Sequence, residues 1–73
     1  MTSRRATDFD RYIGGLIRKH REAKGSSQMT LAAGIGVTYQ QLQKYENGLN
    51  RITASRLYEI AKDLKVPVAL FFP

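Results

Sequence analysis

The spacing of apolar and small residues over residues 28–48 constrains the fold of this chain more than any other feature. The segment reads Q-M-T-L-A-A-G-I-G-V-T-Y-Q-Q-L-Q-K-Y-E-N-G. Its apolar residues recur at helical intervals on both sides of Gly36, at Leu31, Ile35, Leu42 and Tyr45. Gly34 and Gly36 allow a sharp left-handed turn, and Ala32 is small enough for a close crossing. The pattern predicts two helices joined by a tight turn, the second capped by Thr38.

Helical spacing continues outside this segment. A first helix is predicted after Thr7 or Asp8, with its apolar side formed by Phe9, Ile13, Leu16, Ile17 and His20. A fourth helix starts at Thr53 and carries Leu57, Ile60, Ala61 and Leu64. Pro67 suits the first position of a short final helix. We expect one all-α domain over residues 1–73, a compact five-helix bundle.

One pair of adjacent glycines and one pair of adjacent phenylalanines are not explained by helical spacing and point to tertiary contacts. Gly14 and Gly15 lie inside the first helix, where each costs about 1 kcal/mol relative to alanine, so another backbone is expected to approach there. Phe71 and Phe72 are adjacent and cannot both face one core. We expect either that one of them meets a second subunit or that a longer native chain continues beyond Pro73.

The charge balance favours a polyanionic partner. The chain has 12 Lys and Arg against 6 Asp and Glu, a formal net charge of +6, and most of the basic residues precede residue 25. It has no cysteine, which excludes disulfides and thiolate zinc sites. No apolar stretch is long enough to span a membrane, and no apolar signal core follows Arg4 and Arg5, so we expect a cytoplasmic protein.

The helix after the turn has one packing side and one free side. At about 100° per residue, Gln40, Lys44 and Asn47 lie opposite Leu42 and Tyr45. Glutamine pairs bidentately with adenine and lysine reaches guanine, so this side suits the major groove of DNA. A helix that enters the groove by its N-terminal end would contact bases through Tyr39, Gln40 and Lys44.

The helix after Thr38, here called the reading helix, carries a single lysine, which cannot supply the affinity for DNA by itself. Contacts with phosphates are therefore expected elsewhere on the chain. Gln28 and Thr38 lie at helix N-termini, where free N–H groups attract anions, and Asn47 and Arg51 follow the reading helix. The expected phosphate contacts are Gln28, Thr38, Gln41, Asn47 and Arg51. Residues 1–7, with Arg4 and Arg5, form either a flexible basic arm on the duplex or a disordered end.

Over about residues 13–72 the chain resembles the helix-turn-helix domain of the lambda repressor and Cro class. The resemblance rests on Gln28, Leu31-Ala32, Gly36 and the exit Tyr45-Glu46-Asn47-Gly48. It implies a dimer on a near-palindromic operator with half-sites about 34 Å apart. It also implies a structural ion pair between Arg21 and Glu46. Met29-Thr30 replaces the acidic pair that usually follows the opening glutamine, and Gly34 replaces a longer residue.

We therefore expect a sequence-specific transcriptional regulator, a homodimeric repressor whose subunits meet through the Phe71-Phe72 end. The main alternative is a protein-interaction module of the same fold, an antitoxin or a regulator's partner. Non-specific packaging of nucleic acid is a second alternative. Single-strand binding would need an aromatic surface, whereas Tyr45 and Tyr58 are expected in or near the core.

An enzyme is not expected. The chain has one histidine, His20, which follows the apolar side of its helix, and one spaced carboxylate pair, Glu59 and Asp63, on an outer face. The sequence indicates no cofactor, metal or small-molecule ligand.

Overall fold

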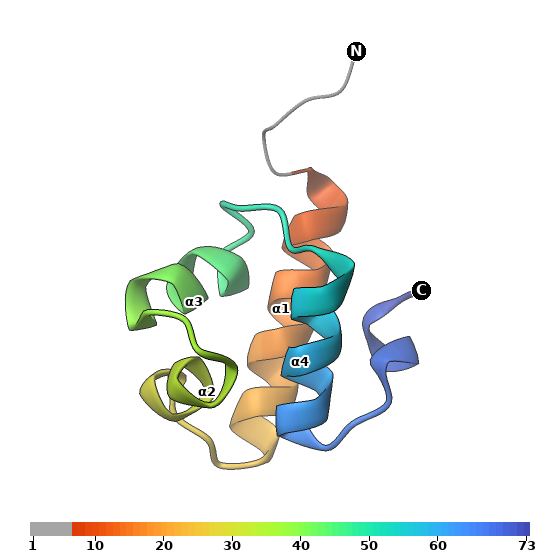
Figure 1. Cartoon of the computed structure of the whole chain (residues 1–73). Helices are drawn as coiled ribbons and strands as arrows, with labels where there is room; N and C mark the ends of the chain where they lie inside the picture. The colour runs from red at the N-terminus through yellow and green to blue at the C-terminus, as the bar shows by residue number, and fades with distance from the viewer. Residues whose placement is uncertain (1–6) are drawn as a thin grey trace.

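The computed structural model describes residues 7–73, so Arg4 and Arg5 lie outside the described residues. The described chain forms four α-helices and one 3₁₀ turn, and none of it forms a strand (Figure 1). The elements are α1 (Asp8–Ala23), α2 (Gln28–Ile35), α3 (Tyr39–Glu46), α4 (Ala54–Leu64) and η1 (Val68–Phe71). Helices α1 and α4 lie side by side, with α2 and α3 against them on one side and η1 on the other. The all-α class is confirmed.

The prediction of five helices is wrong by one, because the last element is a 3₁₀ turn. Pro67 is the N-cap of η1 and not its first residue. The N–H of Leu70 donates to the carbonyl of Pro67 at 3.1 Å, an i to i+3 bond. Short elements of three or four residues are typically 3₁₀ rather than α-helical, and η1 has four residues.

Side-chain caps fix where the helices begin. Thr7 caps α1 and donates its backbone N–H to the Asp10 carboxylate at 2.7 Å, in a capping box. Thr7 is therefore the N-cap of α1, one of the two residues predicted for that position. At the other three α-helices the N-cap side chain, of Ser27, Thr38 or Thr53, accepts a hydrogen bond from the backbone N–H three residues later, without a capping box.

Gly36 makes the turn between α2 and α3, with φ of 73° in the left-handed region. Gly34 has a different role from the one predicted, because it lies inside α2. A Cβ at Gly34 would lie 2.9 Å from the carboxyl carbon of Asp63 in α4, so only a glycine here leaves room for the Asp63 side chain.

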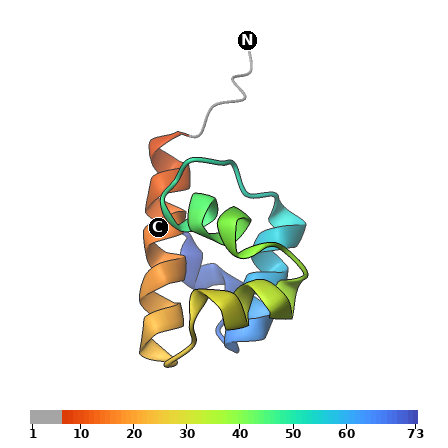
Figure 2. The ribbon, with the colours of Figure 1, turned by 90° about the vertical axis from the view of Figure 1, so that its left-hand side faces the viewer.

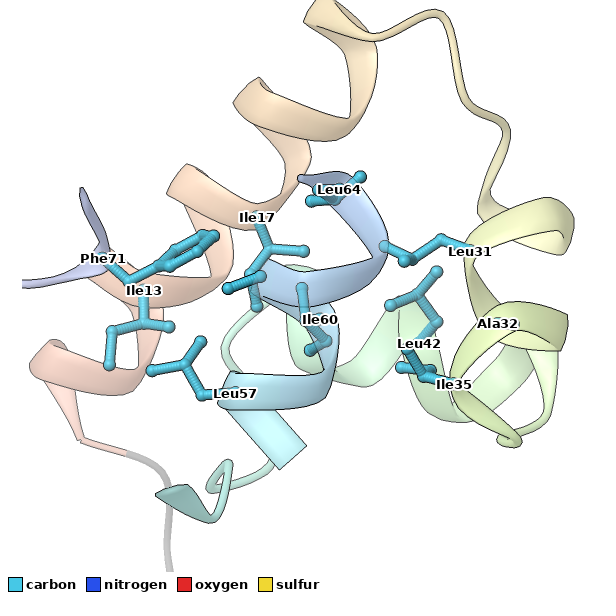
Figure 3. Close-up of a cluster of buried hydrophobic side chains, with 11 residues drawn as sticks. Ile13, Ile17, Leu31, Ala32, Ile35, Leu42, Leu57, Ile60, Leu64 and Phe71 are labelled. Carbon is cyan, nitrogen blue, oxygen red and sulfur yellow. The ribbon is translucent and has the colours of Figure 1, made fainter. Parts of the chain in front are cut away.

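The core lies where all five elements meet (Figure 3). Its largest fully buried side chains are Phe71, Ile17, Leu31, Leu42 and Ile60. Burial separates the two adjacent phenylalanines as expected: Phe71 is 0% exposed and Phe72 is 48% exposed.

Of the other aromatic residues, some are buried as predicted and some are exposed instead. His20 is partly buried and packs edge-on against Phe71, with ring centroids 5.6 Å apart. Tyr45 is partly buried against the core. Tyr58, predicted to lie in or near the core, is 59% exposed, and Phe9 is also exposed on the side predicted to pack. Phe9 stacks on Tyr12 at the surface instead.

Gly14 is where α1 and α3 touch. A Cβ there would lie 2.8 Å from the carbonyl oxygen of Glu46, and closer still to that of Tyr45. Gly15 faces open space. The close backbone approach predicted for the pair therefore applies to Gly14 alone.

Candidate nucleic-acid interface

Helices α2 and α3 form one side of the molecule, with the loop after α3 crossing above them (Figure 2). The three residues predicted to contact bases, Tyr39, Gln40 and Lys44, are all exposed on α3. Leu42 and Glu46 of the same helix are buried. Burial thus separates α3 into a packed side and a free side, as amphipathic helices require.

Gln43 is a residue of this surface that the sequence interpretation missed. Its side-chain amide donates to the hydroxyl of Tyr39 at 2.8 Å, one helical turn away, which orients the tyrosine ring. The i to i+4 spacing is the signal that would have found it. Gln40 and Lys44 have no side-chain hydrogen bond within residues 7–73, so their polar groups are available to a ligand.

A buried carboxylate anchors the C-terminal end of α3. The Glu46 side chain is 0% exposed and accepts four hydrogen bonds. Arg21 donates two of them bidentately, from Nε at 2.6 Å and from Nη2 at 3.0 Å. Gln28 donates a third at 2.9 Å and Arg18 a fourth at 3.4 Å. We call these four side chains the Glu46 hub; it joins α1, α2 and α3.

The hub favours the ionised form of both members of its buried pair. Burial, the largest single effect, raises the pKa of Glu46, but the hydrogen bonds from Arg21, Gln28 and Arg18 and the charge of Arg21 together outweigh it, so the pKa is lowered overall. The hydrogen bond to Glu46 raises the pKa of Arg21 against the smaller opposing effect of burial. The pair therefore stays charged and fixed in geometry near neutral pH.

The predicted phosphate contacts are distributed around α3. The Thr38 hydroxyl accepts from the N–H of Gln41 at 3.0 Å, which places both residues at the start of the helix. Gln28 begins α2, and its side-chain amide is held by Glu46. Asn47 is the C-cap of α3 and is exposed. Arg51 is exposed in the following loop, at a shallow pocket also lined by Phe9 and Phe72.

Arg18 is the second residue that the sequence interpretation missed. Its Nη2 donates to Oδ1 of Asn47 at 2.7 Å, so α1 reaches the edge of the reading helix. Gly14, Arg18 and Arg21 follow at i, i+4 and i+7 and share one side of α1. That spacing was visible in the sequence, but the partner helix was not.

Neither a metal cluster nor a membrane segment is seen in the part of the chain that the structure describes. Residues 7–73 contain no group of three His, Cys, Asp or Glu side chains that could hold a metal ion. None of the described helices is long and apolar enough to cross a membrane.

Comparison with known proteins places this architecture in a family. A family model described as helix-turn-helix matches residues 17–71. The uncharacterised transcriptional regulator in the ATPase CF(0) region of Rhodospirillum rubrum is 56% identical over 63 residues, covering 86% of this chain and 58% of that protein. The chain spans about half the length of the curated relatives that it matches.

Two solved structures share the fold. The restriction-modification controller protein C.AhdI from Aeromonas hydrophila has a TM-score of 0.85 at 26% identity, covering 90% of this chain and 100% of that one. The master regulator for biofilm formation SinR, solved in complex with DNA, has a TM-score of 0.73 at 30% identity, covering 81% of this chain and 95% of that one. These matches confirm the resemblance seen in the sequence, and the chain belongs to the helix-turn-helix family of the lambda repressor and Cro type.

Proposed function

We propose that this chain binds double-stranded DNA sequence-specifically as the DNA-binding part of a transcriptional regulator, and that it acts as a homodimeric repressor on a near-palindromic operator. The observation that carries the proposal is the free side of α3, where Tyr39, Gln40 and Lys44 are exposed together. Gln40 offers a donor and an acceptor to adenine, and Lys44 offers a cation to guanine.

Phosphate contacts would come from the ends of the helices around α3. The first N–H groups of α2, on Gln28 and Met29, have no acceptor within residues 7–73, and neither do those of α3, on Tyr39 and Gln40. Free N–H groups and the positive end of the helix dipole attract phosphate oxygens. The net charge of +6 supplies the long-range attraction, and the DNA complex of SinR supports this use of the fold.

The dimer surface is proposed at the aromatic cluster of Phe9, Tyr12 and Phe72. The ring centroid of Phe9 lies 6.1 Å from that of Tyr12 and 6.1 Å from that of Phe72, and each of the three residues is more than two-fifths exposed. A second copy of the chain would cover them and relate two reading helices by a two-fold axis. The same cluster favours the second candidate function, a protein-interaction module whose partner is a different protein.

Selection of bound fragments from random duplex DNA tests the main proposal. We expect an enriched near-palindrome, and binding that weakens with salt in proportion to the phosphates neutralised. The variant Gln40→Ala should lose about 1–3 kcal/mol of discrimination at one base pair of each half-site, with an unchanged melting temperature. Lys19→Ala is the matched control because Lys19 is also a basic residue and is exposed on α1, outside the α2–α3 surface.

Each result bears on a different part of the proposal. Selection that enriches no sequence would refute sequence-specific binding and favour the interaction module or non-specific packaging. An enriched sequence whose profile is identical for Gln40→Ala would refute the role of Gln40 only.

A further inference from the structure

Arg18 carries a charge that the Glu46 hub does not need. Arg21 already gives Glu46 two short hydrogen bonds and a full opposite charge. Two guanidinium groups therefore face the buried Glu46 carboxylate. The other carboxylate paired with them, the exposed Glu22, lies 4.0 Å from Nη2 of Arg21, so Arg18 shares Glu46 with Arg21 and has no carboxylate of its own within residues 7–73. The charge of Arg18 is accessible, because its side chain is 45% exposed, while the Arg21 side chain is 10% exposed.

Most of the donors of Arg18 are unused. A guanidinium has five N–H donors, and Arg18 gives one to Glu46 and one to Asn47. Within residues 7–73 its Nη1 has no acceptor. Arg21 differs, because its Nε and Nη2 serve Glu46 and its Nη1 donates to the carbonyl of Ser26 at 2.9 Å.

Arg18 also determines which way the Asn47 amide faces. A guanidinium only donates, so Asn47 presents its Oδ1 to Arg18 and turns its NH₂ group away. Phosphate oxygens only accept hydrogen bonds, so this is the orientation in which Asn47 can bind a phosphate. Asn47 is also the C-cap of α3, where the negative end of the helix dipole repels anions unless a cation stands beside it.

We propose that Arg18 and Asn47 form a phosphate clamp, in which Nη1 of Arg18 and Nδ2 of Asn47 donate to the same backbone phosphate of duplex DNA. The clamp rests on the proposed function, because it deepens the DNA-binding surface described above. It adds α1 to that surface, and it makes Arg18 both a ligand of the phosphate and the residue that positions Asn47.

The test compares affinities for two probes, the selected operator and a random-sequence duplex, as a function of salt. Arg18→Ala should weaken both complexes by the same factor, at least about 10-fold, since a hydrogen bond to a charged group is lost. The slope of log affinity against log salt should fall by about 0.9. Lys19→Ala removes the same charge and should change the slope much less.

A double-mutant cycle tests the positioning role. Arg18→Ala should cost less in an Asn47→Ala background than in the native chain, because the orientation of Asn47 then no longer matters. Additive effects would overturn the positioning part of the clamp.

Asn47→Asp keeps the interaction with Arg18 but removes the donor and adds a negative charge, so a folded protein with weaker binding to both probes is expected. This variant keeps the proposal testable if Arg18→Ala unfolds the hub. Native affinity of Asn47→Asp would overturn the clamp, as would equal effects of Arg18→Ala and Lys19→Ala in a chain that still binds its operator. Failure of the native chain to bind either probe would instead overturn the proposed function and the clamp with it.

Discussion

Adding one methyl group to α1 should have opposite effects at two adjacent positions. Gly14 and Gly15 are both helix-interior glycines, and replacing either with alanine favours the helix by about 1 kcal/mol. At Gly15 the new Cβ meets nothing within 4 Å, so the whole gain is kept. At Gly14 it lies 2.8 Å from the carbonyl oxygen of Glu46 and closer to that of Tyr45.

The neighbours of Gly14 are backbone atoms and cannot rotate away, so α1 and α3 must move apart. Overpacking of this kind costs about 1–3 kcal/mol. Because the propensity gain is common to both variants, it cancels in their difference. The free energies of unfolding of Gly14→Ala and Gly15→Ala should therefore differ by about 1–3 kcal/mol, with Gly15→Ala the more stable.

Urea denaturation measures this difference. For a domain of this size the slope is about 1 kcal/mol per molar urea, so the two midpoints should separate by about 1–3 M. In thermal unfolding each kcal/mol corresponds to about 4–8 °C. Equal midpoints with equal slopes would refute the close approach of α1 to α3, and with it the geometry that brings Arg18 and Arg21 to Glu46.

Two further predictions concern the Glu46 hub and the two phenylalanines. Gln28→Ala removes a hydrogen bond that lowers the pKa of Glu46. A carboxyl group whose pKa is lowered by folding contributes stability that is lost as the pH falls through that pKa. Acid unfolding of Gln28→Ala, followed by circular dichroism, should therefore begin at a higher pH than that of the control variant Gln40→Ala. An unchanged acid midpoint would contradict the hub. Phe71→Ala should cost about 3–5 kcal/mol of stability, whereas Phe72→Ala should cost little and weaken self-association in sedimentation equilibrium. Unaltered association of Phe72→Ala would exclude Phe72 from the dimer surface.

Much of the fold follows from local rules in the sequence. The four α-helices begin at residues whose side chains accept a backbone N–H three positions later, and this depends on neighbours along the chain alone. The turn at Gly36 is equally local, since only glycine adopts its left-handed conformation without strain. The exposed side of α3, with Gln40 and Lys44, follows from helical periodicity, so the candidate base contacts were predictable.

Tertiary structure decided the properties that depend on which helix lies opposite a residue. The sequence could not say which of Gly14 and Gly15 faces α3, or that η1 would close as a 3₁₀ turn around a buried Phe71. Arg18 shows the limit most clearly: its spacing from Gly14 is a sequence property, but its contact with Asn47 joins residues 29 positions apart. Periodicity assigns a residue to a side of its helix, and only packing determines what that side meets.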